Sequence, residues 1–505
     1  MNDTYRIEGL PESGQGGLAR LRTLRTETQA AGMPALLLHA GDLLYPSLLS
    51  SSYGGEQMID VMNRLDGDAT AFDDHLFVVF GNHEFDKKKL KDGQKLDARV
   101  EESQFTWLSS NITFANGDDG LPIVDSEHLA PRALVDLDGI KVGIFGLTTP
   151  AKVPDFVSTI DDPAETARAE VALLRSHGAE FVIALTHLEV RNDLALLTSL
   201  EGPLGPDLIV GGHDHQSMIE QVGDRYVVKG DADAVSAVRT IVRRQGAGFA
   251  VTPERVALGP DAYPPEPTVQ ASIDGWIARH QRDFCSQAKI EDGCLDATIG
   301  RTTVPLIAEE LLMRRFETNT GDWLADLARG AYPDQGVQVA LINSGSIRLN
   351  RNVAAGPLTR RHLEELLPYP TGLKIVDVPG KVLRDAVLQH AIEDWTGNGW
   401  FLHVSGLGFT HDVATGTIRD VWIADGHGKR PIRDDETVRV VTTDYLVDPT
   451  LGNRDGYTMI DVAWAKGGDA TLKDLALGAV RAAGDAGISP AADGRICTTS
   501  ERACP

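Results

Sequence analysis

Short, continuous apolar runs alternate along the first half of the chain with segments in which apolar residues recur at helical spacing. The apolar runs have the length of buried strands and occupy residues 35–40, 77–80, 142–147, 181–185 and 207–210. The helical spacing recurs in residues 17–30, 55–65 and 162–177. This alternation predicts a layered α/β domain, in which helices cover the faces of a sheet.

Side chains of the metal-binding types stand directly after several of these predicted strands. They are Asp42, Asn82, His187, His213 and His215. Taken alone, an aspartate after a glycine is more often a turn residue, and a lone histidine is more often structural. Open α/β sheets, however, place their ligand sites at the carboxyl ends of strands. Carboxylate, amide and imidazole donors together suit Mn, Fe, Zn, Ni or Co better than Ca or Mg, so the set predicts one shared metal centre.

The loop after residues 77–80 also carries a candidate catalytic residue. Asn82 and His83 are adjacent, so the amide oxygen can bind a metal while the imidazole faces a substrate. Asp86 follows in the same loop and can orient that imidazole and raise its basicity. Taken alone, Asn-His-Glu could instead cap a helix. In the company of the other donors, we predict catalytic roles for His83 and Asp86.

Length and charge limit the possible partners. A chain of 505 residues is too long for one ordinary core, which predicts two domains. The formal charge of −25 argues against binding of a nucleic-acid polymer or an anionic membrane. A phosphorylated substrate must therefore be captured by metal ions or by a few placed arginines. The sequence has no apolar run long enough for a transmembrane helix, and it does not reveal the oligomeric state.

The cysteines form close pairs in the sequence, Cys285 with Cys294 and Cys497 with Cys504. This spacing predicts small disulfide loops in an oxidising compartment, periplasmic or extracellular, whereas a reduced set would fit a cytosolic chain. Zinc binding is disfavoured because neither pair has C-x-x-C spacing. No signal peptide is visible and no strand fits before Asp3, so we expect a truncated or misassigned beginning.

The motifs taken in order resemble a known family. Asp3-x-Tyr5, Gly41-Asp42, Gly81-Asn82-His83-Glu84, Thr186-His187 and Gly212-His213-Asp214-His215 resemble those of the calcineurin-like metallophosphoesterases, in the two-domain 5'-nucleotidase branch. The resemblance implies a layered αββα domain that holds two divalent or mixed-valence transition-metal ions. It makes Asp42 the bridging carboxylate, with Asn82, His187 and His213 at one metal and Asp3 and His215 at the other. His83 with Asp86 resembles the catalytic dyad of the family.

One motif departs from the family pattern. The family usually has Asp-x-His where this chain has Asp3-Thr4-Tyr5, and a phenol needs a strongly charged cation to bind as phenolate. Tyr45 is a second candidate, because Gly-Asp-x-x-Tyr resembles the purple acid phosphatases, in which tyrosine binds ferric iron. We favour Tyr5 by its position. The departure predicts an altered metal preference at the site of Asp3 and His215.

The second half of the chain is expected to begin after a proline-rich boundary. We predict a metallophosphoesterase domain at 1–262, a linker with a connecting helix at 263–293 and a C-terminal α/β domain at 294–505. In this last domain the resemblance to 5'-nucleotidases implies that Phe401 and Tyr457 sandwich a nucleobase. The remaining predicted substrate-binding residues are Asn343, Gly345, Arg348 and Asp455. Residues 382–395 carry Gln389, Glu393 and Asp394 where family members often place an asparagine and a further arginine, which weakens the case for a plain nucleoside monophosphate.

These features predict a metal-dependent phosphomonoester hydrolase, a 5'-nucleotidase that acts on small nucleotides through a metal-bridging hydroxide. An alternative keeps the same site but hydrolyses a 2',3'-cyclic nucleotide, a nucleotide sugar or a sulfur-linked group. The other alternative is a non-catalytic protein that binds nucleotide or metal, with Tyr5 marking decay of the site of Asp3 and His215.

Overall fold

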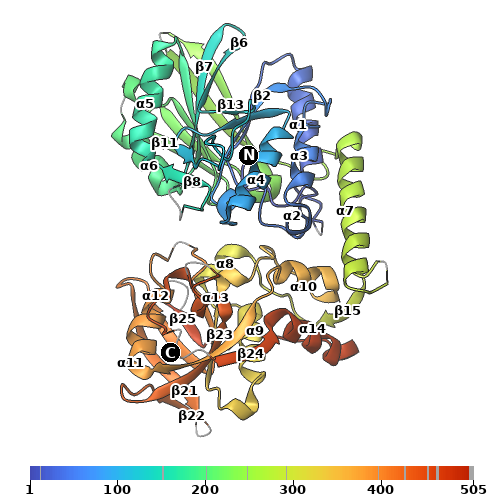
Figure 1. The fold of residues 1–505 in the computed structure, drawn as a ribbon, viewed down its shortest axis with the longest axis vertical. Helices are drawn as coiled ribbons and strands as arrows, with labels where there is room; N and C mark the ends of the chain where they lie inside the picture. The colour runs from blue at the N-terminus through green and yellow to red at the C-terminus, as the bar shows by residue number, and fades with distance from the viewer. Residues whose placement is uncertain are drawn as a thin grey trace. The chain divides into compact units, whose positions relative to one another are not determined.

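The computed structural model describes residues 1–499 except residues 12, 150–152, 201, 247, 292, 396, 426–427, 452–453 and 462–465. The chain divides into two compact units, Met1–His280 and Gln281–Pro505, which run from blue to yellow-green and from yellow-green to red in Figure 1. No described helix is long and apolar enough to cross a bilayer.

The first unit contains a four-stranded sheet and a six-stranded sheet. The four-stranded sheet is parallel, in the order β1 (Leu37–His39), β2 (Asp73–Val79), β3 (Phe105–Leu108), β5 (Leu129–Ala130). The order in the six-stranded sheet is β11 (Met218–Val222), β12 (Arg225–Lys229), β10 (Leu208–Gly211), β9 (Phe181–His187), β7 (Ile140–Thr148), β6 (Arg132–Leu137). Its four central strands are parallel, and β11 and β6 run antiparallel at the edges. Two antiparallel pairs complete the strands, β4 (Ile112–Phe114) with β8 (Val157–Ile160) and β13 (Ser236–Gln245) with β14 (Gly248–Ala257).

The two sheets share one core, and side-chain alternation along β2 shows how. Phe77 and Val79 lie in the core between the sheets together with Ile183 of β9. Leu76 and Val78, which point the other way, pack in the core beneath the helices. Because both faces of β2 are covered, the strand appears in the sequence as a continuous apolar run.

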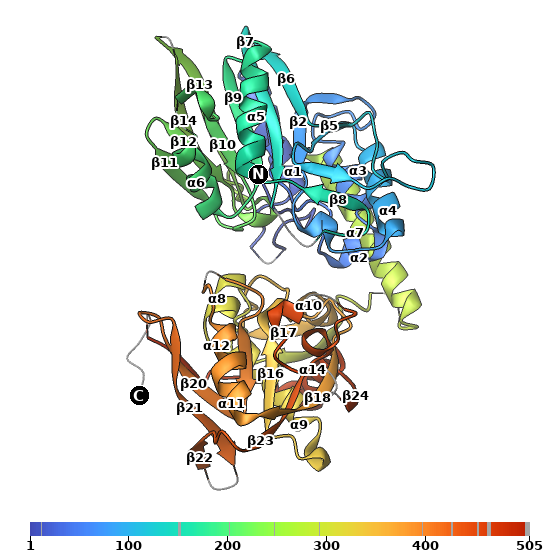
Figure 2. The same cartoon turned by 60° about the vertical axis from the view of Figure 1, so that its left-hand side comes forward.

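Helices cover the outer faces of both sheets (Figure 2). On the six-stranded sheet lie α5 (Pro163–Ser176) and α6 (Val190–Ser199). On the four-stranded sheet lie α1 (Leu18–Ala30), α2 (Leu48–Tyr53), α3 (Glu56–Met62), α4 (Leu90–Glu101) and part of α7 (Pro267–Gln287). The predicted αββα order is therefore confirmed. The start of α5 is fixed locally, because the Asp162 side chain accepts hydrogen bonds from two backbone N–H groups of the first turn and Pro163 occupies the first helical position.

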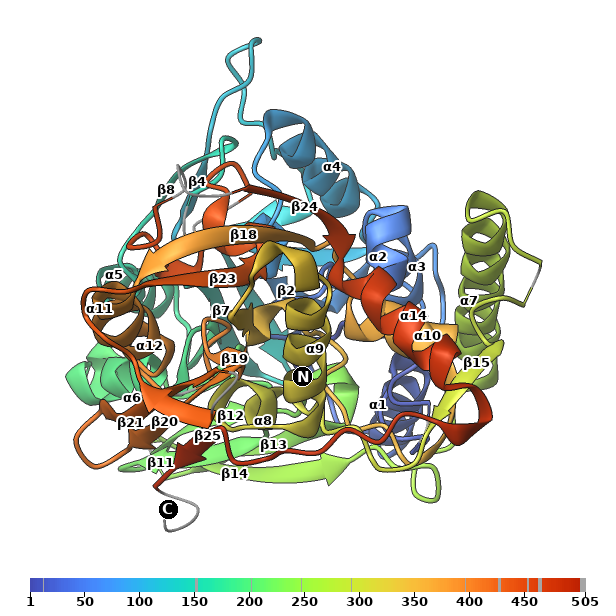
Figure 3. The same cartoon turned by 90° about the horizontal axis from the view of Figure 1, so that it is seen from below.

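The second unit is a mixed α/β domain, as predicted, and Figure 3 shows its sheet from below. Its five-stranded sheet has the order β19 (Leu402–Ser405), β16 (Val339–Asn343), β23 (Thr437–Thr443), β18 (Gly372–Pro379), β24 (Lys466–Thr471). A four-stranded sheet has the order β22 (Gly428–Pro431), β21 (Thr417–Asp425), β20 (Leu407–Asp412), β25 (Ile496–Thr498). Apolar cores lie on both sides of the five-stranded sheet. The helices and short helical segments of this unit include α8 (Glu310–Arg315), α9 (Asn319–Gly330), α10 (Arg360–Leu366), α11 (Gly380–Val382), α12 (Leu388–Ala391), α13 (Asp444–Val447) and α14 (Leu472–Ala483).

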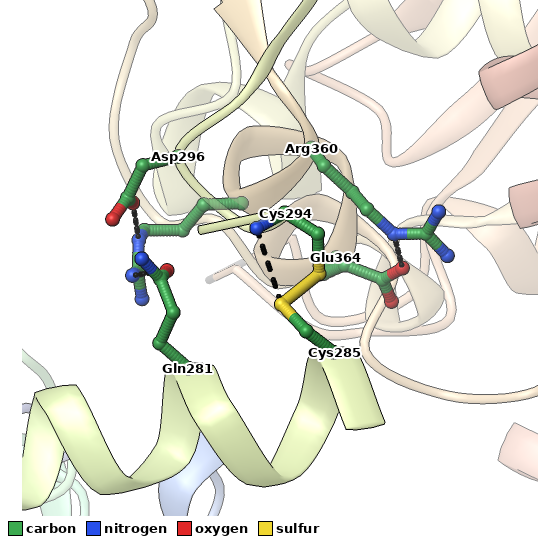
Figure 4. Close-up of a disulfide and its surroundings, with 7 residues drawn as sticks. Gln281, Cys285, Cys294, Asp296, Arg360 and Glu364 are labelled. Atoms are coloured by element: carbon green, nitrogen blue, oxygen red, sulfur yellow. Dashed lines mark hydrogen bonds and ion pairs between the residues drawn. A yellow bond between two sulfur atoms is a disulfide. The ribbon is translucent and has the colours of Figure 1, made fainter. Parts of the chain in front are cut away.

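The expected connecting helix is α7, and the first predicted disulfide closes just after it (Figure 4). Cys285 in α7 is bonded to Cys294, and the Cys294 backbone N–H donates to Cys285 Sγ at 3.1 Å. Both cysteines are buried beside Leu295. The second expected pair involves Cys504, which lies outside the described residues.

Candidate metal centre

The loops that follow β1, β2, β9 and β10 meet at one place in the first unit. Asp42 follows β1 and Asn82 follows β2, whereas His187 ends β9 and His213 lies just past β10. Each of these strands runs parallel to a neighbour in its own sheet, and contacts of His187 with Ala40 and Asn82 place the carboxyl ends of both sheets at one edge. The structure therefore brings the predicted donors together.

One group of donors is centred on Asn82. Its Oδ1 lies 3.1 Å from His187 Nε2 and 3.0 Å from His213 Nδ1. His187 Nε2 is also 3.2 Å from Asp42 Oδ2 and 3.3 Å from His213 Nδ1. His187 is buried, and Asn82 and His213 are half-buried.

The hydrogen bonding of His187 shows that this group fits a cation. Its Nδ1 lies 2.7 Å from the Ala40 carbonyl, which can only accept, so Nδ1 carries the proton. In the neutral imidazole, Nε2 then presents a lone pair towards Asn82 Oδ1 and Asp42 Oδ2. Lone pairs that converge in a buried place repel one another unless a positive charge lies between them, and a transition-metal ion supplies that charge.

The second group contains Asp3, Asp42, His215 and Tyr5. His215 Nε2 lies 3.2 Å from Asp3 Oδ1 and 2.8 Å from Tyr5 Oη. Tyr5 Oη is also 3.2 Å from Asp42 Oδ2 and 3.3 Å from Asp3 Oδ1. Asp42 thus takes part in both groups through the same oxygen. Single atoms of Asp3, Asp42 and His187 lie within 4.8 Å of one another, close enough to hold an ion.

Backbone hydrogen bonds attach Asp3 to the loop that follows β1. Its backbone N–H donates to the Gly41 carbonyl at 2.9 Å, and the Ala40 N–H donates to the Met1 carbonyl at 2.8 Å. Asp3 Oδ2 accepts hydrogen bonds from Asn2 Nδ2 and from the His213 backbone N–H, at 2.7 and 2.9 Å. The residues before Tyr5 are therefore part of the site.

The two candidate tyrosines lie in different surroundings. Tyr5 is buried with its hydroxyl inside the second group of donors. The Tyr45 ring instead lies under Lys87 Nζ, 4.5 Å from the ring centroid, and its hydroxyl lies near Gly54 and Arg99. Burial raises the pKa of Tyr45 to about 12. The geometry favours Tyr5 as the tyrosine that could bind a metal.

His83 stands beside the two groups rather than inside them. Its Nδ1 lies 2.8 Å from Asp86 Oδ2, as the predicted dyad requires. Its Nε2 is turned towards the centre and lies 3.9 Å from Asp42 Oδ2. The ring remains partly exposed, with 13% of the side chain accessible.

The charges in the centre are strongly coupled. Burial disfavours an ionised Asp42, but the facing His187 outweighs this and lowers the pKa of Asp42 to about 2. Burial likewise disfavours the cationic form of His187, yet Asp42 raises the pKa of His187 to about 9. Burial, with His187 nearby, lowers the pKa of His213 to about 3. The carboxylates of the centre thus favour a positive charge beside them.

Glu84 is an organising residue of the centre for which the sequence analysis gave no role. Its carboxylate accepts hydrogen bonds from the backbone N–H groups of Asp42, Leu43, Leu44 and Gly81, at 2.6 to 3.1 Å. Burial, followed by the charge of Asp42, raises the pKa of Glu84 to about 7. A Cβ at Gly81 would lie 2.1 Å from Asp42 Oδ1, so this position admits only glycine. Glu84 holds the two ligand loops together, and its place in the Gly81-Asn82-His83-Glu84 motif was the available signal.

Lys229 at the end of β12 joins the other two ligand loops. It is 1% exposed, and its Nζ donates to the Leu188 and Gly212 carbonyls and to Asp214 Oδ2, at 2.6, 2.8 and 2.5 Å. Asp193 Oδ2 lies 2.7 Å away as an ion pair. Leu188 and Gly212 are the direct neighbours of His187 and His213, so Lys229 fixes the spacing of the two histidines. No local motif in the sequence indicates this residue.

Replacing Lys229 with methionine is expected to lower the free energy of unfolding by about 3–5 kcal/mol, because the substitution leaves two carboxylates without their shared cation. The midpoint of urea denaturation measures the loss. Adding Asp193→Asn to Lys229→Met should recover part of it. An unchanged midpoint in the single variant would contradict this account of Lys229.

In the second unit, the predicted substrate residues divide into two sets. Asn343 Nδ2 donates to Asp455 Oδ2 at 3.1 Å, and Arg348 Nε donates to the Gly345 carbonyl at 2.9 Å. Burial raises the pKa of Asp455, and the positive charge of Arg348 opposes that shift. These residues form a polar group that could receive an anion.

The two predicted stacking residues have different surroundings. Phe401 and Tyr457 are 1% and 0% exposed and pack in one apolar core. Tyr457 Oη donates to the Trp400 carbonyl at 2.6 Å, and the His390 ring stacks on the Trp400 ring with centroids 5.9 Å apart. In this conformation neither Phe401 nor Tyr457 offers a ring face to a ligand, so base stacking there requires the covering residues to move.

Comparison with known proteins places these features in context. The family model for calcineurin-like phosphoesterases matches residues 1–217, and that for the 5'-nucleotidase C-terminal domain matches residues 298–462. A 5'-nucleotidase of Bos taurus is 26% identical over 490 residues, which are 88% of this chain and 79% of that protein. A snake venom 5'-nucleotidase of Naja atra is 26% identical over 443 residues, 80% of this chain and 77% of its own length.

A trifunctional nucleotide phosphoesterase of Bacillus subtilis is 25% identical over 492 residues, 88% of this chain but only 31% of that protein. Among solved structures, a 5'-nucleotidase precursor of Thermus thermophilus matches with a TM-score of 0.81 and 24% identity, over 99% of both chains. A sulfate thiohydrolase of the same genus matches with a TM-score of 0.72 and 18% identity, over 97% of this chain and 84% of that one. These two structures share the fold of both units.

Proposed function

The chain belongs to the calcineurin-like phosphoesterases that carry a 5'-nucleotidase C-terminal domain, and from this premise we propose that it is a metal-dependent hydrolase that releases phosphate from nucleotides. The observation that carries the proposal is the pair of donor groups that share Asp42 Oδ2. The first would hold one transition-metal ion through Asn82, His187 and His213, and the second would hold another through Asp3 and His215. Two such ions, when bound, supply Lewis acidity and lower the pKa of a water molecule.

Residues beside the ions orient the general acid and hold the ligand loops. Asp86 accepts from His83 Nδ1, which orients the ring and stabilises its cationic form. His83 Nε2 then faces the centre, where it donates a hydrogen bond or a proton to the leaving oxygen of the phosphate ester. Glu84 and Lys229 keep the four ligand loops in place, so the donors are arranged before substrate binds.

We assign nucleotide recognition to the second unit, through Arg348, Asn343, Gly345 and Asp455, with Phe401 and Tyr457 as base-stacking residues once they are uncovered. A placed guanidinium can capture an anion that the acidic surface otherwise repels. The functional boundaries that we propose are 1–262 for the metal domain, 263–293 for the linker and 294–505 for the substrate domain. The Cys285–Cys294 disulfide supports work in an oxidising compartment, either the periplasm or the extracellular space.

A second candidate function uses the same metal centre on another ester, such as a 2',3'-cyclic nucleotide, a nucleotide sugar or a sulfur-linked group. The observation that favours it is the segment with α12, where family members often place an asparagine and an arginine. Here the Gln389 side chain donates a hydrogen bond to the Gly416 carbonyl and accepts one from the Ile418 N–H. His390 Nδ1 lies 2.6 Å from Glu393 Oε2. These side chains are engaged within the unit, so the ribose and base would be held by other groups.

Metal analysis combined with a panel of substrates separates these functions. We expect two transition-metal ions per chain and phosphate release that is fastest from nucleoside monophosphates. Faster hydrolysis of a cyclic nucleotide, a nucleotide sugar or a sulfur-linked ester would select the second candidate. Metal binding with no turnover of any ester would leave a binding protein and refute both.

The Tyr5 hydroxyl makes a further prediction about the metal of the second group. Ferric iron bound beside Asp3, Asp42 and His215 should draw the Tyr5 phenol into its coordination as phenolate, because a highly charged cation favours the ionised form. The iron-loaded protein is then expected to show a visible charge-transfer band. Tyr5→Phe should abolish the band, and Tyr45→Phe should retain it. An absorption spectrum that is the same in both variants would contradict phenolate binding.

A further inference from the structure

The central strand β7 ends at Thr148, a buried residue that is not among the predicted ligands. Its side chain nevertheless reaches the loop after β2, because Thr148 Oγ1 donates a hydrogen bond to the Phe80 carbonyl at 2.7 Å. Phe80 directly follows β2 and stands two residues before Asn82. The Thr148 hydroxyl therefore connects the end of β7, in the six-stranded sheet, to a ligand loop of the four-stranded sheet.

Thr148 also lies level with His187, the predicted ligand at the end of β9. In the parallel pairing of β7 with β9, Thr148 is the register partner of His187. The Nε2 of His187 in turn lies 3.1 Å from Asn82 Oδ1. Thr148 is thus joined to one ligand by strand pairing and to the other through the Phe80 carbonyl. It helps to set how far the Asn82 loop stands from His187.

The peptide between Phe80 and Gly81 is held from two sides. Its carbonyl accepts a hydrogen bond from Thr148, and its N–H donates to Glu84 Oε2 at 2.6 Å. Glu84 ties this peptide to the loop of Asp42, whereas Thr148 ties it to the strand that pairs with β9. The two hydrogen bonds therefore control different spacings, Glu84 within the four-stranded sheet and Thr148 between the two sheets.

Thr148 is itself firmly held. Asn111 Oδ1 accepts a hydrogen bond from the Thr148 N–H at 2.9 Å, and Asn111 Nδ2 donates to the Thr148 carbonyl at 2.8 Å. Two residues earlier, a Cβ at Gly146 would lie 2.7 Å from the Leu108 carbonyl oxygen, so β7 approaches the end of β3 directly. Thr148 and Asn111 are 0% and 1% exposed, so these hydrogen bonds lie away from bulk water.

We propose that Thr148 is a positioning residue for the ion held by Asn82, His187 and His213, a role that rests on the metal binding of the proposed function. A buried carbonyl that loses its donor is costly, so the Asn82 loop would shift to pair the Phe80 carbonyl elsewhere. That shift changes the spacing between Asn82 Oδ1 and the two imidazoles. Residues that support metal ligands in this way typically contribute about 10- to 100-fold to metal affinity.

The test compares Co²⁺ affinity in the full chain for the wild type, Thr148→Val and Thr148→Ser, by equilibrium dialysis against buffered Co²⁺. Valine keeps the shape but lacks the hydroxyl, so one of the two Co²⁺ affinities should fall about 10- to 100-fold while the other changes little. Thr148→Ser keeps the hydroxyl and should restore the wild-type affinity. Thr148→Ala lacks the hydroxyl without adding bulk, so it should match Thr148→Val and decides the question if valine does not fold.

Two further backgrounds identify which ion responds. His213→Ala removes a donor of the group around Asn82, and His215→Ala removes a donor of the group around Asp3. Adding Thr148→Val to His215→Ala should weaken the remaining Co²⁺ site about 10- to 100-fold, whereas adding it to His213→Ala should change the remaining site little. Equal weakening on both backgrounds would indicate a general loss of structure and would overturn the proposal.

A matched control separates positioning from the loss of any buried hydrogen bond. Thr442 on β23 of the second unit is equally buried, and its Oγ1 donates to the Leu341 carbonyl at 2.8 Å. Thr442→Val and Thr148→Val should both lower the midpoint of urea denaturation of the metal-free protein, but Thr442→Val should keep both Co²⁺ affinities. Wild-type Co²⁺ affinities in Thr148→Val and Thr148→Ala would overturn the proposal. Two bound ions without hydrolysis of any ester would refute the proposed function, and the affinity comparison would still decide the role of Thr148.

Discussion

Asp42→Asn is expected to abolish phosphate release and to remove metal from the protein at the same time. Asp42 Oδ2 lies within 3.2 Å of both His187 Nε2 and Tyr5 Oη, so it is the one oxygen that belongs to both donor groups. An amide of the same shape keeps the packing but lacks the negative charge that offsets two cations. Substitution of residues that merely support ligands costs about 10- to 100-fold in metal affinity. Loss of the shared ligand should exceed that range.

Elemental analysis after dialysis, together with a phosphate-release assay, measures both effects. A suitable control is Asp60→Asn, because Asp60 lies on α3 of the same unit, outside the ligand loops, and accepts hydrogen bonds from Arg64, Ser272 and Trp276. That variant should keep its metal and its turnover. If Asp42→Asn retained full metal content and activity, the shared centre would not be the catalytic site.

His83→Asn should separate catalysis from metal binding. The His83 ring lies beside the donor groups, with Nδ1 on Asp86 and Nε2 turned towards the centre. Its removal takes away the group that protonates the leaving oxygen, which typically costs about 10² to 10⁴-fold in rate. The metal content should not change, because no predicted ligand atom is lost. Rate measurements at saturating substrate, with elemental analysis of the same samples, provide the comparison.

Asp86→Asn is expected to have a smaller effect on catalysis than His83→Asn. It keeps the imidazole but replaces the carboxylate that stabilises its cationic form, so kcat should fall less than in His83→Asn while KM changes little. Activity equal to the wild type in His83→Asn would remove His83 from the mechanism. A parallel loss of metal would show instead that the ring supports the ligand loops.

The layered fold and the meeting of the ligand loops could be predicted from the sequence because both depend on local signals. Phe77 to Phe80 form a continuous apolar run, and the residues that follow a buried parallel strand necessarily lie at the edge of its sheet. The choice of Tyr5 over Tyr45 was made by motif position, and the structure places the Tyr5 hydroxyl among the donors. The metal-binding and catalytic roles of these residues remain predictions.

Other features depend on tertiary contacts that no local pattern encodes. Lys229 meets Asp193 and Asp214 only after β12 pairs with β10 and α6 has packed. The burial of Phe401 and Tyr457 depends on the core around β19, which the family motif does not indicate, and their base-stacking role remains a prediction.

Alternate side chains of β2 pack in two different cores, and this fixes the position of Asn82, which follows the strand. A slip of this strand by one residue would exchange Phe77 and Val79 with Leu76 and Val78 between two cores, and the close packing of side chains of different size opposes this exchange. Asn82 is therefore set at a fixed distance along the strand axis by side chains that never touch an ion. The packing of the apolar cores therefore contributes to metal selection, because it sets the position of one of the ligands.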